Sequence, residues 1–142
     1  LDVLVVVTLG GRDPSALQGE VPENARVAEY LPYDRLMPLT SVYVTNGGYG
    51  GVQQALRDGV PMVVAGDSED KPEVAARVAW SGAGIDLRTG TPSPEALRSA
   101  VQRVLSEGSF RAAAGRMAEA IAGYDTLALI EAELEGAVVR AS

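Results

Sequence analysis

Short apolar runs alternate along the chain with stretches of helical periodicity, and glycine, proline or aspartate separates them. Val3–Thr8 is a continuous apolar run, which is typical of a parallel strand covered on both faces. Asp70–Ser81 places Val74 and Val78 on one face at helical spacing. Because strands that alternate with helices form βαβ units, the pattern predicts an α/β fold with a doubly wound parallel sheet. The other predicted strands are Ala25–Glu29, Val42–Thr45, Pro61–Val64 and Gly82–Leu87, and the other predicted helical segments are Asp34–Leu39, Val52–Arg57, Ser93–Ser106, Ser109–Ala122 and Thr126–Val139.

Four glycines lie between Asn46 and Gly51, after one predicted strand and before a predicted helix. Glycine lets a ligand approach the backbone closely, and the N–H groups at a helix start favour an anion, typically phosphate. The segment matches neither the Gly-x-Gly-x-x-Gly dinucleotide fingerprint nor the Gly-Lys-Ser/Thr ending of a P-loop. The residues therefore indicate a site for a phosphorylated small molecule, with an ordinary tight turn as the alternative.

Composition narrows the possible functions. A chain of 142 residues with 46% hydrophobic content suits one globular domain. The net charge of −7 argues against nucleic acid as a partner, because no basic face is available for its phosphates. The chain has no cysteine and no histidine, so it cannot supply a thiolate, a histidine base or a histidine-rich metal site. No apolar run approaches the ~20 residues of a membrane span, and no signal peptide is visible, so we expect a cytoplasmic protein.

Five spaced motifs between about Val3 and Leu105 resemble one known family, the nucleotide-sugar glycosyltransferases of the two-domain GT-B fold. The resemblance is to their C-terminal, donor-binding half, in particular that of the bacterial macrolide and natural-product enzymes, which are related to UDP-glycosyltransferases. It implies a Rossmann-like domain that binds a nucleotide-sugar donor. The motifs are Tyr30-Leu-Pro, Val44–Leu56, Gly59–Val64, Glu69–Val78 and Gly82–Leu87.

The resemblance assigns roles to individual residues. It places the nucleotide base beside Tyr30 and Leu31, the ribose hydroxyls on Gln54, and the hydroxyls of the donor sugar on Asp70 and Lys71. Each role has a plainer alternative: Tyr30 as a core aromatic, Gln54 as an exposed helix residue, and Asp70 as the N-cap of a helix. The residues that the resemblance places on the donor diphosphate are Asn46, Gly47, Gly48, Gly50 and Gly51.

Four of these positions depart from the family pattern. Asn46 stands where the family has histidine, Gly51 where it has threonine, Gln54 where it has glutamate, and Lys71 where it has glutamine. Losing an imidazole and gaining an ammonium either moves the charge that meets the diphosphate or indicates a donor other than UDP-glucose, such as a deoxysugar on dTDP.

The resemblance also implies that parts of the family's architecture lie outside this chain. The catalytic histidine belongs to an N-terminal acceptor domain, so this chain is expected to hold no catalytic residue and to be inactive alone. The donor domain's first strand and helix would precede Leu1, and that strand normally pairs beside Val42–Thr45. We therefore expect a domain without its first βα unit, with either an unusual sheet or a homo-oligomer formed by strand exchange.

The resulting expectation is the donor-binding domain of an inverting glycosyltransferase. The whole enzyme would move a hexose or deoxyhexose from a UDP- or dTDP-sugar to an acceptor hydroxyl, with no metal and no cofactor. A non-catalytic nucleotide-sugar binding module of the same fold is the alternative, motivated by the four departures. A sugar-nucleotide epimerase is disfavoured, because such enzymes need a catalytic histidine and this chain has none.

Overall fold

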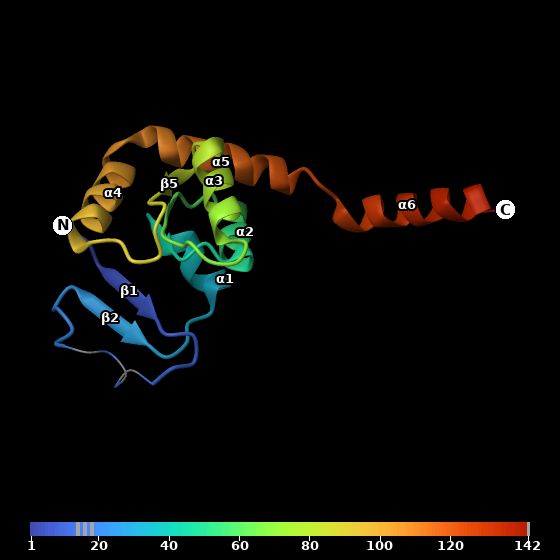
Figure 1. Ribbon diagram of the computed structural model, residues 1–142. Coiled ribbons are helices and arrows are strands. Elements are labelled where there is room, and N and C mark those ends of the chain that lie inside the picture. Colours follow the sequence, from blue (N-terminus) through green and yellow to red (C-terminus); the bar gives the residue numbers. More distant parts are fainter. Residues whose placement is uncertain (14, 16, 18, 142) are drawn as a thin grey trace.

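The computed structural model describes residues 1–13, 15, 17 and 19–141, with side chains described as far as residue 136. Strands and helices alternate as the sequence predicts, and every predicted element is present within a few residues of its expected bounds (Figure 1). The α/β fold class is therefore confirmed. The elements are β1 (Val5–Thr8), β2 (Ala25–Ala28), α1 (Tyr33–Leu36), the 3₁₀ helix η2 (Met37–Leu39), β3 (Tyr43–Thr45), α2 (Tyr49–Arg57), β4 (Met62–Val64), α3 (Lys71–Ser81), β5 (Gly84–Asp86), α4 (Pro94–Ser106), α5 (Gly108–Ala122) and α6 (Thr126–Ala141).

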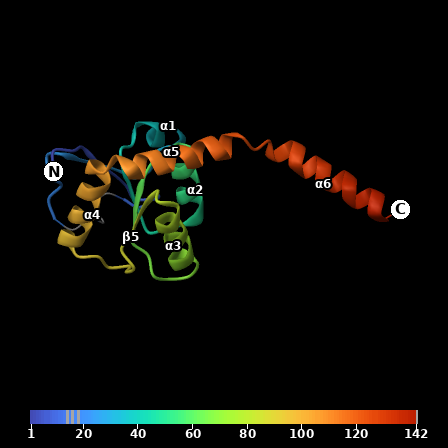
Figure 2. The same cartoon turned by 90° about the horizontal axis from the view of Figure 1, so that it is seen from above.

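Three strands form a parallel sheet in the order β3-β4-β5, with helices on both faces. Strand β4 lies in the middle, and its side chains alternate between the two faces. Met62 and Val64 point into a cluster with α2 and α3, whereas Val63 packs on the other face against α4 and the start of α5. All three side chains are fully buried. Figure 2 shows α4 on one side of β5 and helices α2 and α3 on the other, which is the doubly wound arrangement that the sequence predicts.

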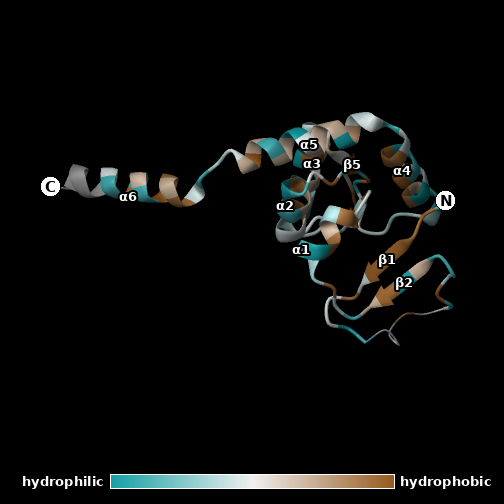
Figure 3. Ribbon diagram, turned by 180° about the vertical axis from the view of Figure 1, so that it is seen from behind, coloured by the Kyte–Doolittle hydropathy of each residue, from teal (hydrophilic) through white to brown (hydrophobic). Residues whose placement is uncertain are grey.

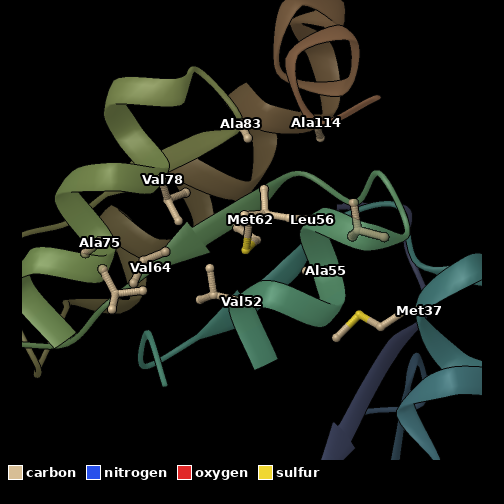
Figure 4. Close-up of a cluster of buried hydrophobic side chains, with 12 residues drawn as sticks. Met37, Val52, Ala55, Leu56, Met62, Val64, Ala75, Val78, Ala83 and Ala114 are labelled. Atoms are coloured by element: carbon tan, nitrogen blue, oxygen red, sulfur yellow. The ribbon is translucent and has the colours of Figure 1, made fainter. Parts of the chain in front are cut away.

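The main core lies between this sheet and helices α2, α3 and α5. It consists of small and medium-sized apolar side chains, and Figure 4 shows Val52 of α2 and Met62 of β4 near its centre. Because these side chains are short, the helices approach the sheet closely. The buried members are Met37, Val52, Ala55, Leu56, Val60, Met62, Val64, Val74, Ala75, Val78, Ala83 and Ala114.

The other two strands form a sheet of their own. Strands β1 and β2 are parallel and in register from Val5 opposite Ala25 to Thr8 opposite Ala28. Within the described residues no strand pairing joins this sheet to β3, and Figure 1 shows the two strands apart from the helical layers. Val5 and Val6 are 42% and 38% exposed, and Figure 3 shows β1 as an apolar strand with no helix over it. The predicted unusual sheet is thus a sheet in two pieces.

Two sets of contacts tie the segments around β3 together. The rings of Tyr33 in α1 and Tyr43 in β3 meet edge to face with centroids 5.9 Å apart. Burial, together with the hydrogen bond and charge of Tyr43, raises the pKa of Tyr33 to about 12, although a hydrogen bond with Thr8 of β1 acts in the opposite direction. Arg111 of α5 donates hydrogen bonds to the carbonyl oxygens of three residues that are distant in sequence, Thr40, Ser41 and Gly59.

Helix α6 extends away from the rest of the molecule in both Figure 1 and Figure 2. None of its side chains is buried as far as residue 136, and Leu127 and Leu134 are among its exposed apolar residues. Across the described residues, no helix combines the length and the apolar character that crossing a membrane requires.

Candidate functional site

Loops from three strands meet at the carboxyl edge of the β3-β4-β5 sheet. The loop after β3 touches the loop after β4 so closely that a Cβ added at Gly66 would overlap the carbonyl oxygen of Asn46 and lie 3.1 Å from the Cβ of Lys71. The loop after β4 in turn contacts the loop after β5, because the Asp67 carboxylate accepts a hydrogen bond of 2.7 Å from the Gly90 amide. Ligands of parallel α/β sheets bind at this edge, so the three loops form the candidate site.

The glycine loop begins with a left-handed residue, Gly47, at φ +85°. Its amide donates to the Thr45 hydroxyl at 3.2 Å, and the next amide, that of Gly48, donates to the Asn46 side-chain oxygen at 3.1 Å. These two amides, which the sequence places on the diphosphate, are therefore already engaged by the protein. The side-chain amide nitrogen of Asn46 makes no hydrogen bond among the described residues and keeps its donors.

Helix α2 begins directly after this loop. Its first intrahelical hydrogen bond runs from the Val52 amide to the Gly48 carbonyl at 3.1 Å. The three preceding amides, of Tyr49, Gly50 and Gly51, have no acceptor in the described part of the chain. Unpaired N–H groups in the first turn of a helix carry its positive end, so these amides are the donors ready to meet an anion.

The side of α2 that faces β3 explains one departure from the family pattern. A Cβ added at Gly51 would lie 2.8 Å from the Tyr43 hydroxyl oxygen, which is too close for an unstrained contact. The threonine of the family would therefore not fit at position 51 unless Tyr43 moved. A Cβ at Gly50, in contrast, would meet nothing within 4 Å, so this residue lies at the open side of the helix.

Gln54 lies one helical turn beyond Gly50, on the outer side of α2. Its side chain is partly buried and lines a shallow hollow together with Gly50, Gln53, Arg57 and Ile121. The hollow begins at the open side of the helix start and runs along α2 toward the end of α5. The structure thus connects Gln54 to the glycine loop through Gly50.

The turn after β4 carries the other two predicted polar residues. Asp70 occupies the N-cap position of α3, but its side chain accepts no capping hydrogen bond, so the carboxylate remains available for other contacts. Lys71 begins the helix, and its side chain is only 15% exposed because its stem packs against Gly47 and Gly66. Its ammonium binds the Glu69 carboxylate and lies 3.3 Å from the Ser68 hydroxyl oxygen. The lysine lowers the pKa of Glu69.

The residues predicted for the nucleotide base lie elsewhere. Tyr30 and Leu31 follow β2, in the two-stranded sheet, and no hydrogen bond or ion pair of the described residues connects them to the glycine loop. Tyr30 is 72% exposed, so the alternative that it is a core aromatic is wrong. The structure brings the predicted diphosphate and sugar residues together and leaves the predicted base residues in the segment between β2 and α1.

Two residues at this edge escaped the sequence analysis. Glu69 and Arg88 are non-glycine residues with positive φ, at 58° and 55°, in the turns after β4 and β5. Such backbone is costly for these residue types and gathers at functional sites. Glu69 belongs to a recognised motif, but the motif gave it no role. In the described part of the chain, this edge included, no group of three or more His, Cys, Asp and Glu side chains is arranged to hold a metal ion.

Comparison with known proteins identifies the family of the chain. Residues 1–135 match the family model described as the C-terminal domain of erythromycin biosynthesis protein CIII-like proteins. UDP-glucosyltransferase 1 of Beauveria bassiana is 49% identical over 112 residues, which cover 78% of this chain and 24% of that protein. The 4'-demethylrebeccamycin synthase of Lentzea aerocolonigenes is 46% identical over 137 residues, or 96% of this chain and 32% of that protein.

The chain is also similar to a solved glycosyltransferase structure. The spinosyn rhamnosyltransferase SpnG complexed with thymidine diphosphate is 29% identical, with a TM-score of 0.78 over 92% of this chain and 35% of that chain. The chain therefore spans about a quarter to a third of the length of these similar proteins.

Proposed function

Because the chain belongs to the family of erythromycin biosynthesis protein CIII-like C-terminal domains, within the GT-B glycosyltransferases, we propose that it is the donor-binding domain of a glycosyltransferase and binds a UDP- or dTDP-sugar. The similar proteins are named for glucosyl, rhamnosyl and related transfers, and one was solved with thymidine diphosphate. The observation that carries the proposal is the row of unpaired amides at the start of α2, beside the turn that ends at Lys71.

In this proposal the donor diphosphate lies at the start of α2. The amides of Tyr49, Gly50 and Gly51 and the side-chain amide of Asn46 donate to its oxygens, and the positive end of the helix offsets its charge. Gly47 and Gly48 contribute by shape, because their backbone leaves space that a side chain would fill. This differs from the expectation that all loop amides bind the phosphates, since Thr45 and Asn46 already engage two of them.

The remaining assignments extend outward from the diphosphate. Gln54 lies one turn along α2, where the hollow beginning at Gly50 offers room for the ribose and the side chain offers a hydrogen bond to its hydroxyls. Asp70 and Lys71 contact the transferred sugar, because the Asp70 carboxylate makes no cap and so is available to sugar hydroxyls. Tyr30, exposed after β2, stacks on the base, with Leu31 beside it.

The reaction of the whole enzyme would be inverting transfer of a hexose or deoxyhexose. An acceptor hydroxyl oxygen forms a bond to the anomeric carbon, while the bond from that carbon to the diphosphate oxygen breaks and its electron pair leaves with the nucleoside diphosphate. The hydroxyl proton passes to a base outside this chain, because this chain has no histidine to accept it. Amides that meet the leaving diphosphate stabilise the charge that develops on it. The chain alone binds the donor without transferring the sugar.

The split sheet bears on the partners of the domain. One edge of β1 and one edge of β3 pair with no strand in the described chain, and unpaired edges attract further strands. We propose that an N-terminal acceptor domain completes the enzyme, and that the isolated chain forms homo-oligomers through these edges. The average mass by light scattering at rising protein concentration tests the second proposal, and a monomer at every concentration contradicts it.

Calorimetric titration of the chain with dTDP, UDP and their glucose conjugates tests the proposed function. We expect saturable binding of at least one nucleotide. Adding a side chain at Gly50 by Gly50→Val should weaken that binding, because the branched side chain would stand over the anion-ready amides, whereas Gly115→Ala in α5 should leave it unchanged. At both positions an added Cβ would meet nothing within 4 Å. A wild-type chain that binds none of the four compounds at millimolar concentration contradicts the proposal. Trp80 is almost fully exposed, so calorimetry is preferred to fluorescence.

A further inference from the structure

Lys71 is the only lysine in the sequence, and the fold holds it in an unusual position. Its backbone and stem lie against the glycine loop: a Cβ added at Gly47 would be 3.5 Å from the Lys71 carbonyl oxygen and 3.7 Å from its Cβ. The side chain is 15% exposed, whereas lysine is ordinarily among the most exposed residue types. The ammonium is therefore kept at the edge of the candidate site and not spread into solvent.

A carboxylate from the same turn meets this ammonium. Glu69 binds the Lys71 ammonium although it lies only two residues earlier in the chain, and Ser68 adds a hydroxyl 3.3 Å away. The Glu69 backbone has φ 58°, a left-handed conformation that is unfavourable for a non-glycine residue. The Glu69 side chain itself is 76% exposed, so its carboxylate is accessible to a ligand from solvent.

The pairing changes what Lys71 can offer a ligand. An unpaired ammonium is a cation with three donors, and it suits a diphosphate, whose oxygens only accept. A paired ammonium has its charge offset and part of its donors used, and it stands beside carboxylate oxygens that accept. Such an edge of donors and acceptors suits sugar hydroxyls, because each hydroxyl both donates and accepts.

On the basis of the proposed function, we propose that Glu69 determines specificity: as the counter-ion of Lys71, it turns this lysine from a diphosphate contact into a sugar contact. Glu69 thereby makes the domain favour a complete nucleotide-sugar over the nucleoside diphosphate that remains after transfer. A free Lys71 would bind both ligands through their shared diphosphate and would erase part of that preference.

Glu69→Gln tests this by removing the charge and keeping the shape. We expect dTDP or UDP to bind about threefold to tenfold more tightly, with a steeper dependence on salt, while the ratio of nucleotide-sugar affinity to nucleoside-diphosphate affinity falls by a similar factor. Glu73→Gln is the matched control. It removes the same charge from an ion pair with Arg77 on the outside of α3 and should leave the ratio unchanged. Glu69→Gly, which also relieves the left-handed backbone, should repeat the effect if Glu69→Gln folds poorly.

Chemical protection of Lys71 gives a second measurement. Because Lys71 is the only lysine, its acylation by an amine reagent can be followed in one peptide by mass spectrometry. In the wild type the nucleotide-sugar should protect Lys71 more than the nucleoside diphosphate does, and in Glu69→Gln the two ligands should protect it equally. Equal loss of affinity for both ligands in Glu69→Gln, or an unchanged ratio and salt dependence, overturns this inference alone. A wild-type chain that binds no nucleotide overturns the proposed function as well.

Discussion

Gly47 and Gly50 belong to the same glycine-rich segment, and the structure predicts opposite effects when each is replaced by alanine. Gly47 has φ +85°, and an added Cβ would lie 2.9 Å from the Cγ1 of Val64, which is fully buried. The left-handed backbone costs alanine about 1–2 kcal/mol, and forcing a methyl group into a packed core costs about 1–3 kcal/mol. Gly47→Ala should therefore lower the free energy of unfolding by about 2–5 kcal/mol.

Gly50 is the internal control for this prediction. It lies in the first turn of α2, its φ is not in the left-handed range, and an added Cβ would meet nothing within 4 Å. Alanine there removes the excess backbone freedom of glycine, so Gly50→Ala should raise the free energy of unfolding by up to about 1 kcal/mol.

Urea unfolding followed by far-UV circular dichroism measures both changes. With a denaturant slope of about 1–3 kcal/mol per molar for a domain of this size, the two variants should unfold at urea concentrations at least about 0.7 M apart. If they unfold at the same concentration, Gly47 is not held in the left-handed conformation against Val64. The contact between the glycine loop and the turn ending at Lys71 would then be wrong too, because both rest on the same backbone.

Three further outcomes test other parts of the fold. Arg111→Ala should lower the free energy of unfolding by about 1–3 kcal/mol, because three carbonyl oxygens lose their charged donor. Arg116→Ala, on the exposed side of α5, should change it by less than about 0.5 kcal/mol. Urea unfolding measures both changes. The raised pKa of Tyr33, about 12 against about 10 in the unfolded chain, stabilises the fold fully below about pH 10, and this contribution is lost as the pH rises to about 12. Tyr33→Phe should weaken that loss of stability and the exposed Tyr124→Phe should not, as urea midpoints at pH 8 and pH 11 would show. Hydrogen exchange should be faster at the amides of β1 than at those of β4, which has a strand on each side, and equal protection in the monomer would contradict the split sheet.

The sequence predicted the elements well because their signals are local. Ser93 illustrates this: cap residue, proline and acid follow one another, and in the structure the Ser93 hydroxyl oxygen accepts a hydrogen bond of 3.2 Å from the Ala96 amide. Apolar runs likewise predicted the positions of the strands in the larger sheet. Strand β4, for example, is buried on both faces and is an unbroken apolar segment in the sequence.

The details of the site depend on contacts that no local pattern encodes. Thr45 and Asn46 engage the amides of Gly47 and Gly48 only because the loop torsions bring their side-chain oxygens back onto the chain. Asp70 resembles a helix cap in sequence, yet its side chain does not cap. A residue type can be placed on a loop from sequence, but which of its atoms remains available is decided by the folded backbone.

Strand β1 forms where the sequence predicts it, but it is less buried than its apolar sequence indicates. Its run of valines reads as a strand covered on both faces, and the strand is present, but Val5 and Val6 remain substantially exposed. Because no layer of the described chain covers these valines, β1 gains only part of the apolar burial that its sequence indicates. Strand β3, in the other sheet, likewise has a neighbour on one side only in the described chain. In the enzyme that we propose, an added strand and the acceptor domain would cover β1 and account for its apolar character, which this chain alone does not explain. In that proposed enzyme, contacts from outside the chain would complete the sheet that positions the glycine loop, and the exposed valines of β1 and the unpaired amides of α2 would then serve one assembly.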